Sequence, residues 1–386
     1  MKLKSLRYSQ HEGRPNTWRV NGLTFDEINL LVGKNASGKT RTLNVINGLA
    51  GLLSQDSPLK YISGDYEVVF EDGHKLLTYS LKYSDQIVTS EEFAIDGKKF
   101  LERGAEGIGK IYAVKENKWI EFQTPPNRLA SAARRDSIQH PYFESLFQWG
   151  NDLRFFAFVT SMGKDHLALI VKEGAPISFN PKDPNQVAGV YRRGYTKLGQ
   201  PFKQNIIKDM ATVGYEIEDV GLAPPLSIQV APEIQIQGEM VALYVKERTL
   251  LPMIYQHEMS QGMFRVLSMI IHLNYAVMDS RPSCILVDDI GEGLDFDRSC
   301  QLIKLLIEKA THTSVQLIMA TNDRFIMNAV PLESWSLLRR EGGDCRVYNY
   351  RNSKKIFDDF KFTGLNNFDF LAVDFVGEAG EANASD

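Results

Sequence analysis

The chain has 386 residues, of which 43% are hydrophobic and 24% are charged, a composition typical of a folded globular protein and not of a disordered or disulfide-rich one. Its 44 Lys and Arg against 48 Asp and Glu give a net charge of −4, which excludes a general attraction to nucleic acid or to an anionic membrane. No apolar run reaches the length of about 18 residues that a membrane span needs, no secretory signal is expected, and the three cysteines lack a zinc-binding spacing. We therefore expect a cytoplasmic protein that makes no contact with a membrane.

The first stretch with a chemical signature is GKNASGKT, residues 33–40. An apolar run, Ile28–Val32, precedes it as a predicted buried strand, and the residues after it have the apolar spacing of an amphipathic helix. A strand, a glycine-rich turn and a helix in this order form a phosphate-binding loop, in which backbone N–H groups at the helix start point at the phosphates. The lysine supplies a charge to the phosphate oxygens, and the threonine hydroxyl is suited to Mg²⁺. The residues predicted to hold the phosphorylated ligand are Gly33, Lys34, Asn35, Ala36, Ser37, Gly38, Lys39, Thr40 and Arg41, with Thr40 also on the metal.

About 200 residues separate this loop from the next chemical signature, too many for a connection, so we predict an inserted lobe over residues 59–254. Between Tyr61 and Phe122, short apolar runs alternate with turns, which predicts an antiparallel sheet. The glycine-rich stretch RGAEGIGKI, residues 103–111, lies between two such runs and has no Ser or Thr after its lysine. We therefore predict a hairpin connection there, and not a second phosphate loop.

The sequence pattern in the rest of the predicted lobe is more typical of helices. Phe143, Leu146 and Trp149 stand at helical spacing and are expected in the core, and the absence of sustained heptads predicts that there is no coiled-coil arm. Basic residues with aromatic neighbours cluster at two places, where we expect solvated faces; if the protein binds nucleic acid, it binds there. The clusters are Arg128, Arg134 and Arg135, and Arg192, Arg193, Lys197, Lys203 and Lys208.

The second half of the chain carries another helix start, MSQGMFR, and an apolar strand that ends in acids, CILVDDIGEGLD. Ser260 stands at the N-cap of the predicted helix and Gly262 opens its backbone, so this helix presents a second set of free N–H groups. Asp288 ends the strand, where a carboxylate is suited to hold Mg²⁺, and Asp289 is suited to polarise an attacking water. One chain cannot readily aim two helix starts at one γ-phosphate, so we expect the second helix to serve the nucleotide of another copy.

These stretches resemble the motifs of the ABC-type ATPases, and among them the RecF/SMC/OLD-like branch, over about the first 55 residues and residues 255–330. GKNASGKT resembles the Walker A motif, MSQGMFR the signature motif, ILVDD the Walker B motif, and GLD the D-loop, while LIMATND falls where the family has its switch strand. The resemblance implies ATP and Mg²⁺ as cofactors and ATP hydrolysis as the activity. It also implies nucleotide contacts from Ser260, Gly262, Arg265 and Asp295.

Two positions depart from the family pattern. Asp289 stands where the family has a glutamate, one methylene longer, so either Asp289 or Glu292 is the predicted catalytic base. The switch position is Asn322 instead of a histidine, and an amide orients a water or a phosphate but carries no proton. Slow hydrolysis is therefore expected. The resemblance also implies a glutamine on the Mg²⁺, for which Gln139 is the candidate.

The predicted fold class is α/β: a P-loop NTPase of the ABC-type ATPase head class, with a mixed parallel and antiparallel core sheet, an inserted α+β lobe and no coiled-coil arm. The predicted ATPase core comprises residues 1–58 and 255–374, and residues 375–386 are a predicted mobile acidic tail.

The resemblance implies a regulatory ATPase in which two copies close head to head around ATP. Too few residues follow the predicted core for the nuclease domain that OLD-like relatives carry, so the chain resembles the ATPase half of bacterial anti-phage pairs of the PARIS/OLD-like type. Such pairing implies a separate, nuclease-like effector protein as the partner. The alternatives are a RecF-like DNA-repair ATPase that binds DNA directly, and a small-molecule kinase, which leaves the signature stretch without a purpose.

Overall fold

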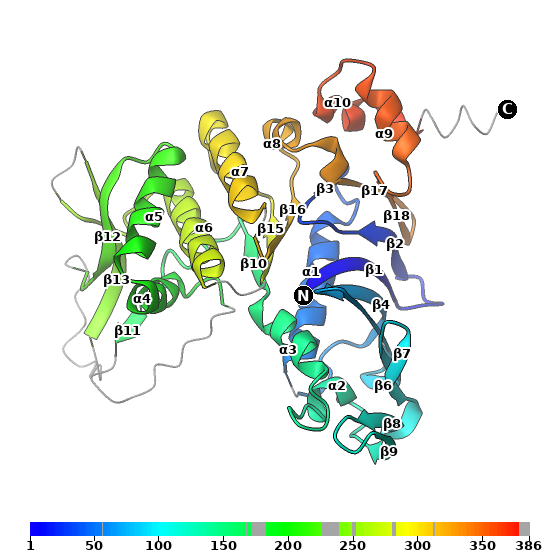
Figure 1. The fold of residues 1–386 in the computed structure, drawn as a ribbon. Helices are drawn as coiled ribbons and strands as arrows, with labels where there is room; N and C mark the ends of the chain where they lie inside the picture. The colour runs from blue at the N-terminus through cyan, green and yellow to red at the C-terminus, as the bar shows by residue number, and fades with distance from the viewer. Residues whose placement is uncertain are drawn as a thin grey trace. The chain divides into compact units, whose positions relative to one another are not determined.

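The computed structural model describes residues 1–55, 57–166, 168–170, 183–225, 239–248, 252–279, 283–311 and 313–377. The chain divides into two compact units, most of whose elements are labelled in Figure 1. Unit 1 comprises Met1–Leu153, Pro282–Leu286 and Gln316–Asp386, and unit 2 comprises Arg154–Arg281 and Val287–Val315.

Unit 1 combines one large sheet with helices. Its strands are β1 (Lys2–Gln10), β2 (Trp18–Thr24), β3 (Ile28–Val32), β4 (Ser63–Asp72), β5 (Lys75–Ser84), β6 (Ile87–Ile95), β7 (Lys98–Arg103), β8 (Ile108–Ala113), β9 (Lys118–Gln123), β16 (Val315–Ala320), β17 (Trp335–Glu341) and β18 (Asp344–Asn349), and the division from unit 2 falls within β15 (Ser283–Asp288). Its helices are α1 (Lys39–Ser54), α2 (Ala130–Ala133), α3 (Phe143–Asp152), α8 (Arg324–Ala329), α9 (Lys354–Lys361) and α10 (Asn367–Ala372), with short 3-10 turns η1 (Ala105–Gly107) and η2 (Leu332–Ser334).

The strands of unit 1 follow the order β16-β3-β17-β18-β2-β1-β4-β5-β6-β7-β8-β9 in a single sheet. β3 is parallel to both of its neighbours, β16 and β17, and is buried from Asn29 to Val32, as a strand covered on both faces must be. From β1 to β9 all neighbours in the sheet are antiparallel, and η1 lies in the predicted hairpin connection between β7 and β8. The mixed sheet and the antiparallel run predicted from the sequence are therefore confirmed.

Two helices cover the buried side chains of β4. On α1, the predicted apolar face is buried, and a Cβ added at Gly48 would lie 3.8 Å from the hydroxyl of Tyr66 on β4. On α3, Trp149 sets its ring edge against Phe70, with the ring centroids 4.8 Å apart. The helices also touch each other, because Gly150 lets the backbone of α3 approach the carbonyl oxygen of Ala50. The helical spacing of Phe143, Leu146 and Trp149 thus marks core positions, as predicted.

A buried ion pair fixes the connection from β9 to α2. The side chains of Glu91 on β6 and Arg103 on β7 are both fully buried, and Glu91 Oε2 lies 3.2 Å from Arg103 Nη1. Glu91 also accepts hydrogen bonds from the backbone N–H groups of Ala130 and Ser131, at 2.6 and 3.0 Å. Arg103 donates to three carbonyl oxygens between Pro125 and Arg128. Charge-assisted hydrogen bonds out of reach of water therefore hold this segment against the sheet.

Among the described residues, unit 2 contains a small sheet, one further short strand and four helices. Its strands are β10 (Arg154–Ala157), β11 (Ala168–Ile170), β12 (Ile217–Ala223), β13 (Glu239–Glu247) and β14 (Ile254–Tyr255), and its helices are α4 (Val187–Leu198), α5 (Gln200–Thr212), α6 (Gln261–Met278) and α7 (Phe296–Ala310). β13 pairs antiparallel with β11, β12 and β14. Asp209 on α5 accepts from Asn274 on α6 at 2.6 Å and pairs with Lys309 on α7 at 2.8 Å. Three helices therefore share one buried carboxylate.

The observed units divide the chain at other places than the predicted domains. The predicted lobe 59–254 is split after Leu153, because β4 pairs with β1 and so extends the N-terminal sheet. The predicted tail also begins later. Phe375 packs its ring on Phe360 with centroids 5.2 Å apart and so belongs to the aromatic cluster of α9 and α10, and Val376 is also buried, at 3% exposure. The rest of the predicted tail, from residue 378, lies outside the described residues.

Candidate functional site

The predicted phosphate loop joins β3 to α1 in unit 1. Gly33 follows the last residue of β3, and a Cβ at this position would lie only 2.5 Å from the carbonyl oxygen of Leu338, so the close approach requires glycine. Gly38 is the N-cap of α1; no side chain of the described residues caps this helix, and its first turn contains no acid. The free N–H groups and the positive dipole end of α1 can therefore bind an anion.

The loop gathers further donors for a polyphosphate. Lys39 is 7% exposed, and its ammonium group donates to the carbonyl oxygens of Gly33 at 2.9 Å and of Lys34 at 3.4 Å. The hydroxyl of Ser37 is buried and has no hydrogen-bond partner among the described residues. Thr40 is exposed at the second position of α1. A cation, an unpartnered hydroxyl and a helix start at one loop fit a phosphate group and, at Thr40, a metal ion bound to it.

Trp18, at the start of β2, supports this helix start. Its indole is 1% exposed, and a Cβ added at Gly38 would lie 3.3 Å from the ring. The guanidinium of Arg41 stacks on the same ring, 4.4 Å from its centroid, in a cation–π contact. Burial lowers the pKa of Arg41. Arg41, a predicted ligand contact, therefore lies against Trp18 beside the loop. Sequence reasoning missed Trp18, since a single tryptophan so far before the loop carries no local signal.

The predicted switch residue Asn322 lies at the same edge of the sheet as the loop. β16 runs parallel to β3, with Ala320 paired to Leu31, so the chain leaves both strands in the same direction. Asp323 follows Asn322 and caps α8, accepting from the backbone N–H groups of Phe325 and Ile326 at 2.7 and 3.2 Å. This cap fixes the backbone directly after Asn322.

In unit 2, the signature stretch begins α6 as predicted. Ser260 is the N-cap, and its hydroxyl oxygen accepts from the backbone N–H of Met263 at 3.2 Å. Gly262 lies against the D-loop, because a Cβ there would be 2.6 Å from the carbonyl oxygen of Gly293. The helix start and the D-loop therefore form one packed element, in which residue 262 cannot carry a side chain.

Arg265 joins this element together. Its guanidinium donates to the carbonyl oxygen of Glu292 at 2.8 Å and, through Nε and Nη2, to that of Thr160 at 3.2 Å. It is 8% exposed, and burial lowers its pKa. The N–H groups of Arg265, which the family resemblance assigns to the nucleotide, are therefore hydrogen-bonded to the carbonyl oxygens of Thr160 and Glu292. Sequence reasoning did not identify Thr160, because it stands 105 residues away and has no motif around it.

The acids that follow β15 have different surroundings. Asp288 ends the strand at 3% exposure, and its carbonyl oxygen accepts from Phe158 at 3.0 Å. Asp289 has φ 51°, a left-handed conformation that few non-glycine residues adopt. Glu292 is exposed, and its backbone N–H donates to the carbonyl oxygen of Asp289 at 3.1 Å. Asp295 caps α7 through the backbone N–H of Arg298 at 3.0 Å, which lowers the pKa of the carboxyl group.

Gln139, the predicted metal ligand, lies beside the β8–β9 hairpin. Its carbonyl oxygen accepts from Val114 at 2.9 Å, and its backbone N–H donates to Asp136 at 2.7 Å. The strands β17, β18, β2, β1, β4, β5, β6 and β7 stand between β8 and β3 in the sheet. The structure therefore does not bring Gln139 to the phosphate loop, because its segment follows the far end of the sheet.

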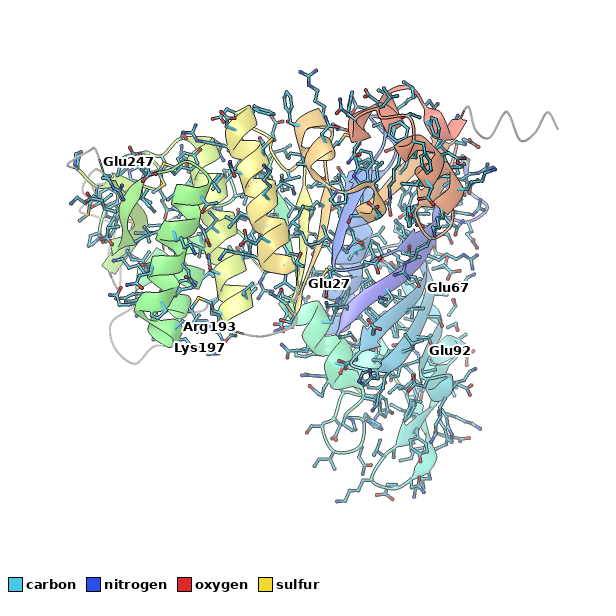
Figure 2. All side chains as sticks on the ribbon, turned by 45° about the horizontal axis from the view of Figure 1, so that its top comes forward. Glu27, Glu67, Glu92, Arg193, Lys197 and Glu247 are labelled. Carbon is cyan, nitrogen blue, oxygen red and sulfur yellow. The ribbon has the colours of Figure 1, made fainter. Side chains whose placement is uncertain are left out.

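Acidic neighbours offset the predicted basic clusters. Arg135 pairs with Glu144 at 3.1 Å, and Lys203 and Lys197 pair with Asp219 and Asp279. Arg193 and Lys197 lie on α4, as labelled in Figure 2. These pairs remove part of the positive charge that a nucleic-acid surface needs.

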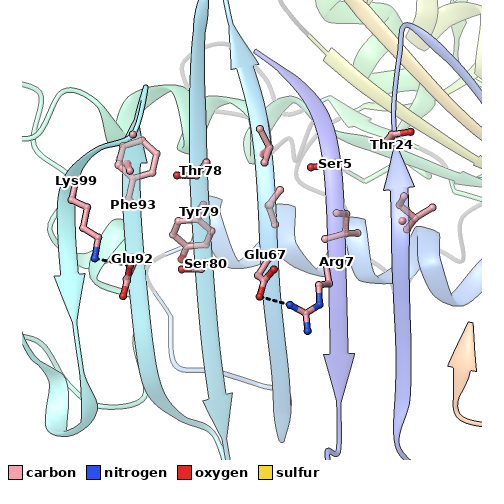
Figure 3. Close-up of a pocket in the computed structure, with 17 residues that line it drawn as sticks. Ser5, Arg7, Thr24, Glu67, Thr78, Tyr79, Ser80, Glu92, Phe93 and Lys99 are labelled. Atoms are coloured by element: carbon pink, nitrogen blue, oxygen red, sulfur yellow. Dashed lines mark hydrogen bonds and ion pairs between the residues drawn. The ribbon is translucent and has the colours of Figure 1, made fainter. Parts of the chain in front are cut away.

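A separate hollow of about 580 Å³ lies on the open face of the sheet in unit 1 (Figure 3). Two charge pairs cross it, Arg7 with Glu67 at 2.6 Å and Lys99 with Glu92 at 3.2 Å. Its charges satisfy each other, so it presents no single sign to a ligand.

Of the described helices, none is long and apolar enough to cross a membrane.

Comparison with models of protein families and with curated proteins gives no match. Among solved structures, an SMC head bound to the C-winged helix domain of ScpA matches with a TM-score of 0.52 at 13% identity, covering 92% of this chain and 99% of that one. The SMC head domain from Thermotoga maritima has a TM-score of 0.44 at 13% identity, with 90% and 99% covered. An SMC head with an extended coiled coil, bound to the C-terminal domain of ScpA derived from Pyrococcus furiosus, has a TM-score of 0.46 at 11% identity, with 93% and 99% covered.

The first of these structures shows the fold. The chain has the α/β fold of an SMC head, an ABC-type ATPase fold with a large mixed sheet, and the predicted fold class is confirmed. Within the described ranges no long coiled-coil arm is present, since α6, with 18 residues, is the longest helix there.

Proposed function

We propose that this chain binds ATP with Mg²⁺ and hydrolyses it slowly, as an ABC-type ATPase in which two copies close head to head around the nucleotides. The observation that carries the proposal is the start of α1. There a buried ammonium group, that of Lys39, is held by carbonyl oxygens beside a helix N-terminus without an acid in its first turn. The SMC-head fold and the order of the sequence motifs support the same function.

The loop residues bind and orient the triphosphate. The ammonium group of Lys39 exchanges carbonyl oxygens for phosphate oxygens, which are stronger acceptors because they are charged. The N–H groups at the start of α1 and the Ser37 hydroxyl donate to the same phosphates. We assign Thr40 and Asp288 as the Mg²⁺ ligands; the ion neutralises charge on the transferred phosphoryl group.

We assign the attacking water to Asp289, with Glu292 as the alternative base. The left-handed backbone of Asp289 is a strained conformation of the kind that persists at functional sites. Glu292 is exposed three residues later and has a longer reach. Asn322 orients the water or the γ-phosphate but cannot take up a proton, so turnover is slow.

The signature helix of one copy completes the site of the other. The oxygen of Ser260 accepts from Met263, so its hydroxyl proton is left to donate to a γ-phosphate, together with the N–H groups of α6. ATP, unlike ADP, has a γ-phosphate that both copies can contact, so ATP favours the closed pair. Hydrolysis removes this shared contact, and the two copies separate.

The closed pair, in our proposal, is the sensor and regulatory subunit of a separate nuclease-like effector in anti-phage defence. The support is the likeness of the motifs to the RecF/SMC/OLD-like branch. Direct DNA binding, the RecF-like alternative, has less support, because acids of the same unit pair with Lys197 and Lys203.

Two measurements test this function. Sedimentation of the full chain with Mg²⁺ and a non-hydrolysable ATP analogue is expected to give a dimer, and sedimentation with ADP a monomer; a monomer in both conditions contradicts the pairing. Hydrolysis rates of Asp289→Asn and Glu292→Gln identify the base, since only the variant that removes it should lose turnover. Wild-type rates in both variants would show that neither residue is the base.

A further inference from the structure

A second hollow in unit 1 adjoins the phosphate loop. It measures about 560 Å³, within the usual range of binding pockets. One wall is the loop from Lys34 to Ser37, and a second is β17 from Leu337 to Arg340. Leu371 and Asp374 line it from α10 and the residues after it. The C-terminal part of the chain therefore shares a cavity with the loop that is proposed to bind ATP.

Positive charge dominates the lining of this hollow. Its charged members are the cations Lys34, Arg339 and Arg340 and a single acid, Asp374. That carboxylate lies 3.6 Å from the ammonium group of Lys34 and 3.3 Å from the guanidinium of Arg339. Arg340 is exposed and forms no ion pair with a described residue. Burial, together with the nearby positive charge of Arg340, lowers the pKa of Arg41 in α1, so the charge of the hollow acts on the phosphate-binding helix.

The described chain ends at the rim of the hollow. Phe375 is fixed by its packing on Phe360, with the ring centroids 5.2 Å apart. Two residues later, a Cβ added at Gly377 would lie 2.6 Å from Nη1 of Arg339 and 3.1 Å from Oδ2 of Asp374. Both of these side chains line the hollow. Whatever follows Gly377 therefore begins beside the basic lining.

The residues that follow Gly377, residues 378–386, have the sequence EAGEANASD. We call them the acidic segment, because they include Glu378, Glu381 and Asp386 and no lysine or arginine. Glu378 is bonded directly to Gly377, and the four residues up to Glu381 span at most about 14 Å. The first two carboxylates can therefore reach the cations of the hollow, and their charge is opposite to that of its lining.

We propose that the acidic segment docks in the basic hollow of its own chain and restrains the phosphate loop. Its carboxylates pair there with Arg340 and Lys34. Three observations carry the docking: the charges are opposite, the chain enters at the rim of the hollow, and Arg340 has no acidic partner among the described residues. The docking is independent of the proposed function, whereas its effect on ATP rests on that function.

The docked segment opposes the binding of a triphosphate. The hollow and the loop share the residues from Lys34 to Ser37, so carboxylates in the hollow lie beside the backbone that surrounds the phosphates. They repel the charge of the triphosphate and occupy the ammonium group of Lys34. Because coupling between two binding events is reciprocal, ATP weakens the docking of the segment to the same extent.

Covalent attachment makes a weak contact sufficient for this restraint. Ion pairs at exposed sites contribute little free energy individually. A segment attached at the rim, however, has an effective concentration on the order of millimolar. A triphosphate held by several charge-assisted hydrogen bonds can still displace it. The segment therefore acts as a reversible restraint and not as a permanent block.

Lysine acetylation measures the docking without nucleotide. The full chain and a neutralised variant, Glu378→Gln with Glu381→Gln, are treated with an acetylating reagent, and mass spectrometry gives the reaction rate at Lys34. We expect this rate to be at least about threefold lower in wild type, because an ammonium group paired with a carboxylate offers less free amine. Lys115, exposed in the β8–β9 turn, is the internal control and should react equally in both. Equal rates at Lys34 overturn the docking and leave the proposed function intact.

ATP affinity measures the restraint on the loop. Titration calorimetry with Mg²⁺ and the ATP analogue should give a dissociation constant about three- to tenfold lower for the neutralised variant than for wild type. The matched control, Glu116→Gln with Glu121→Gln, removes two exposed charges from the β8–β9 hairpin and should bind like wild type. An unchanged affinity in the neutralised variant overturns the restraint.

Arg340→Gln distinguishes a contact in the hollow from repulsion at a distance. Without this partner, neutralising the segment should change the ATP affinity less than about twofold, because the effects of residues in contact are not additive. If neutralisation strengthens ATP binding equally with and without Arg340, the acids act from a distance and the docking is overturned. A chain that binds the analogue in none of these forms overturns the proposed function, while the rates at Lys34 still decide the docking.

Discussion

The ammonium group of Lys39 donates a hydrogen bond of 2.9 Å to the carbonyl oxygen of Gly33, the first residue of the loop in which both stand. A buried cation is thus positioned by neutral acceptors that a charged ligand can replace. The affinity of the loop for a triphosphate should therefore depend on Lys39.

Replacing Lys39 by alanine should weaken ATP binding between about 10-fold and about 150-fold, because a hydrogen bond to a charged group contributes about 1.5–3 kcal/mol. Titration calorimetry with Mg²⁺ and the ATP analogue measures the change. Lys110→Ala is the matched control, since Lys110 follows the glycines of the β7–β8 connection and lies exposed. Equal affinity of the Lys39 variant and wild type would contradict the assignment of the loop.

Replacing Arg265 by lysine should lower the stability of unit 2 even without nucleotide. Lysine keeps the charge but cannot reach the carbonyl oxygens of both Thr160 and Glu292, so hydrogen bonds worth about 1–3 kcal/mol are lost. The melting temperature of the nucleotide-free protein reports the loss. If the variant melts like wild type and is defective only in ATP-dependent pairing, Arg265 contacts the nucleotide directly, as the family resemblance implies.

Replacing Glu91 by glutamine should destabilise the protein by about 3–5 kcal/mol, because it leaves the fully buried guanidinium of Arg103 without its counter-charge. The neighbouring residue offers a control. Glu92 is paired with Lys99 at 3.2 Å on the open face of the sheet, and Glu92→Gln should cost less than about 1 kcal/mol. Urea unfolding monitored by circular dichroism compares the two variants. Similar unfolding midpoints for both would mean that the buried pair contributes no more than the exposed one.

His272 should make the protein less stable as the pH falls. It is buried in α6 beside Phe156, and burial, together with the nearby positive charge of Arg154, lowers its pKa to about 3. The unfolded chain takes up a proton near pH 6.5 that the folded chain refuses, so the free energy of unfolding decreases below that pH by about 1.4 kcal/mol per pH unit until about pH 3. The contribution is fully present above pH 6.5.

His272→Leu removes this proton uptake from the unfolded state. Between pH 6 and pH 4, its free energy of unfolding should therefore fall less steeply than that of wild type, by about 1.4 kcal/mol per pH unit. Denaturant unfolding at several pH values gives the two slopes. Parallel slopes would show that His272 is protonated in the folded protein or does not contribute.

The local sequence determined much of the secondary structure and the motifs of this protein. The run Ile28–Val32 is a buried strand because every residue but one is apolar. GKNASGKT forms the turn that leads into α1, because its glycines adopt the backbone conformation that the turn requires. Ser260 caps α6 and Asp288 ends β15 for reasons that lie within a few residues of each. Four motifs in order were therefore enough to predict the fold class.

The tertiary structure decided the arrangements that depend on distant partners. Long-range strand pairing places residues 59–153 in unit 1, and the strand order puts the segment of Gln139 beyond the far end of the sheet from the loop. Arg265 donates hydrogen bonds to the carbonyl oxygen of Thr160, 105 residues away, and the ring of Trp18 packs against Gly38. A helix cap or a turn forms its hydrogen bonds among neighbours in the chain, so the local sequence predicts it. The partner of a buried guanidinium or indole depends instead on which distant backbone the fold brings next to it. No local sequence pattern indicates that partner.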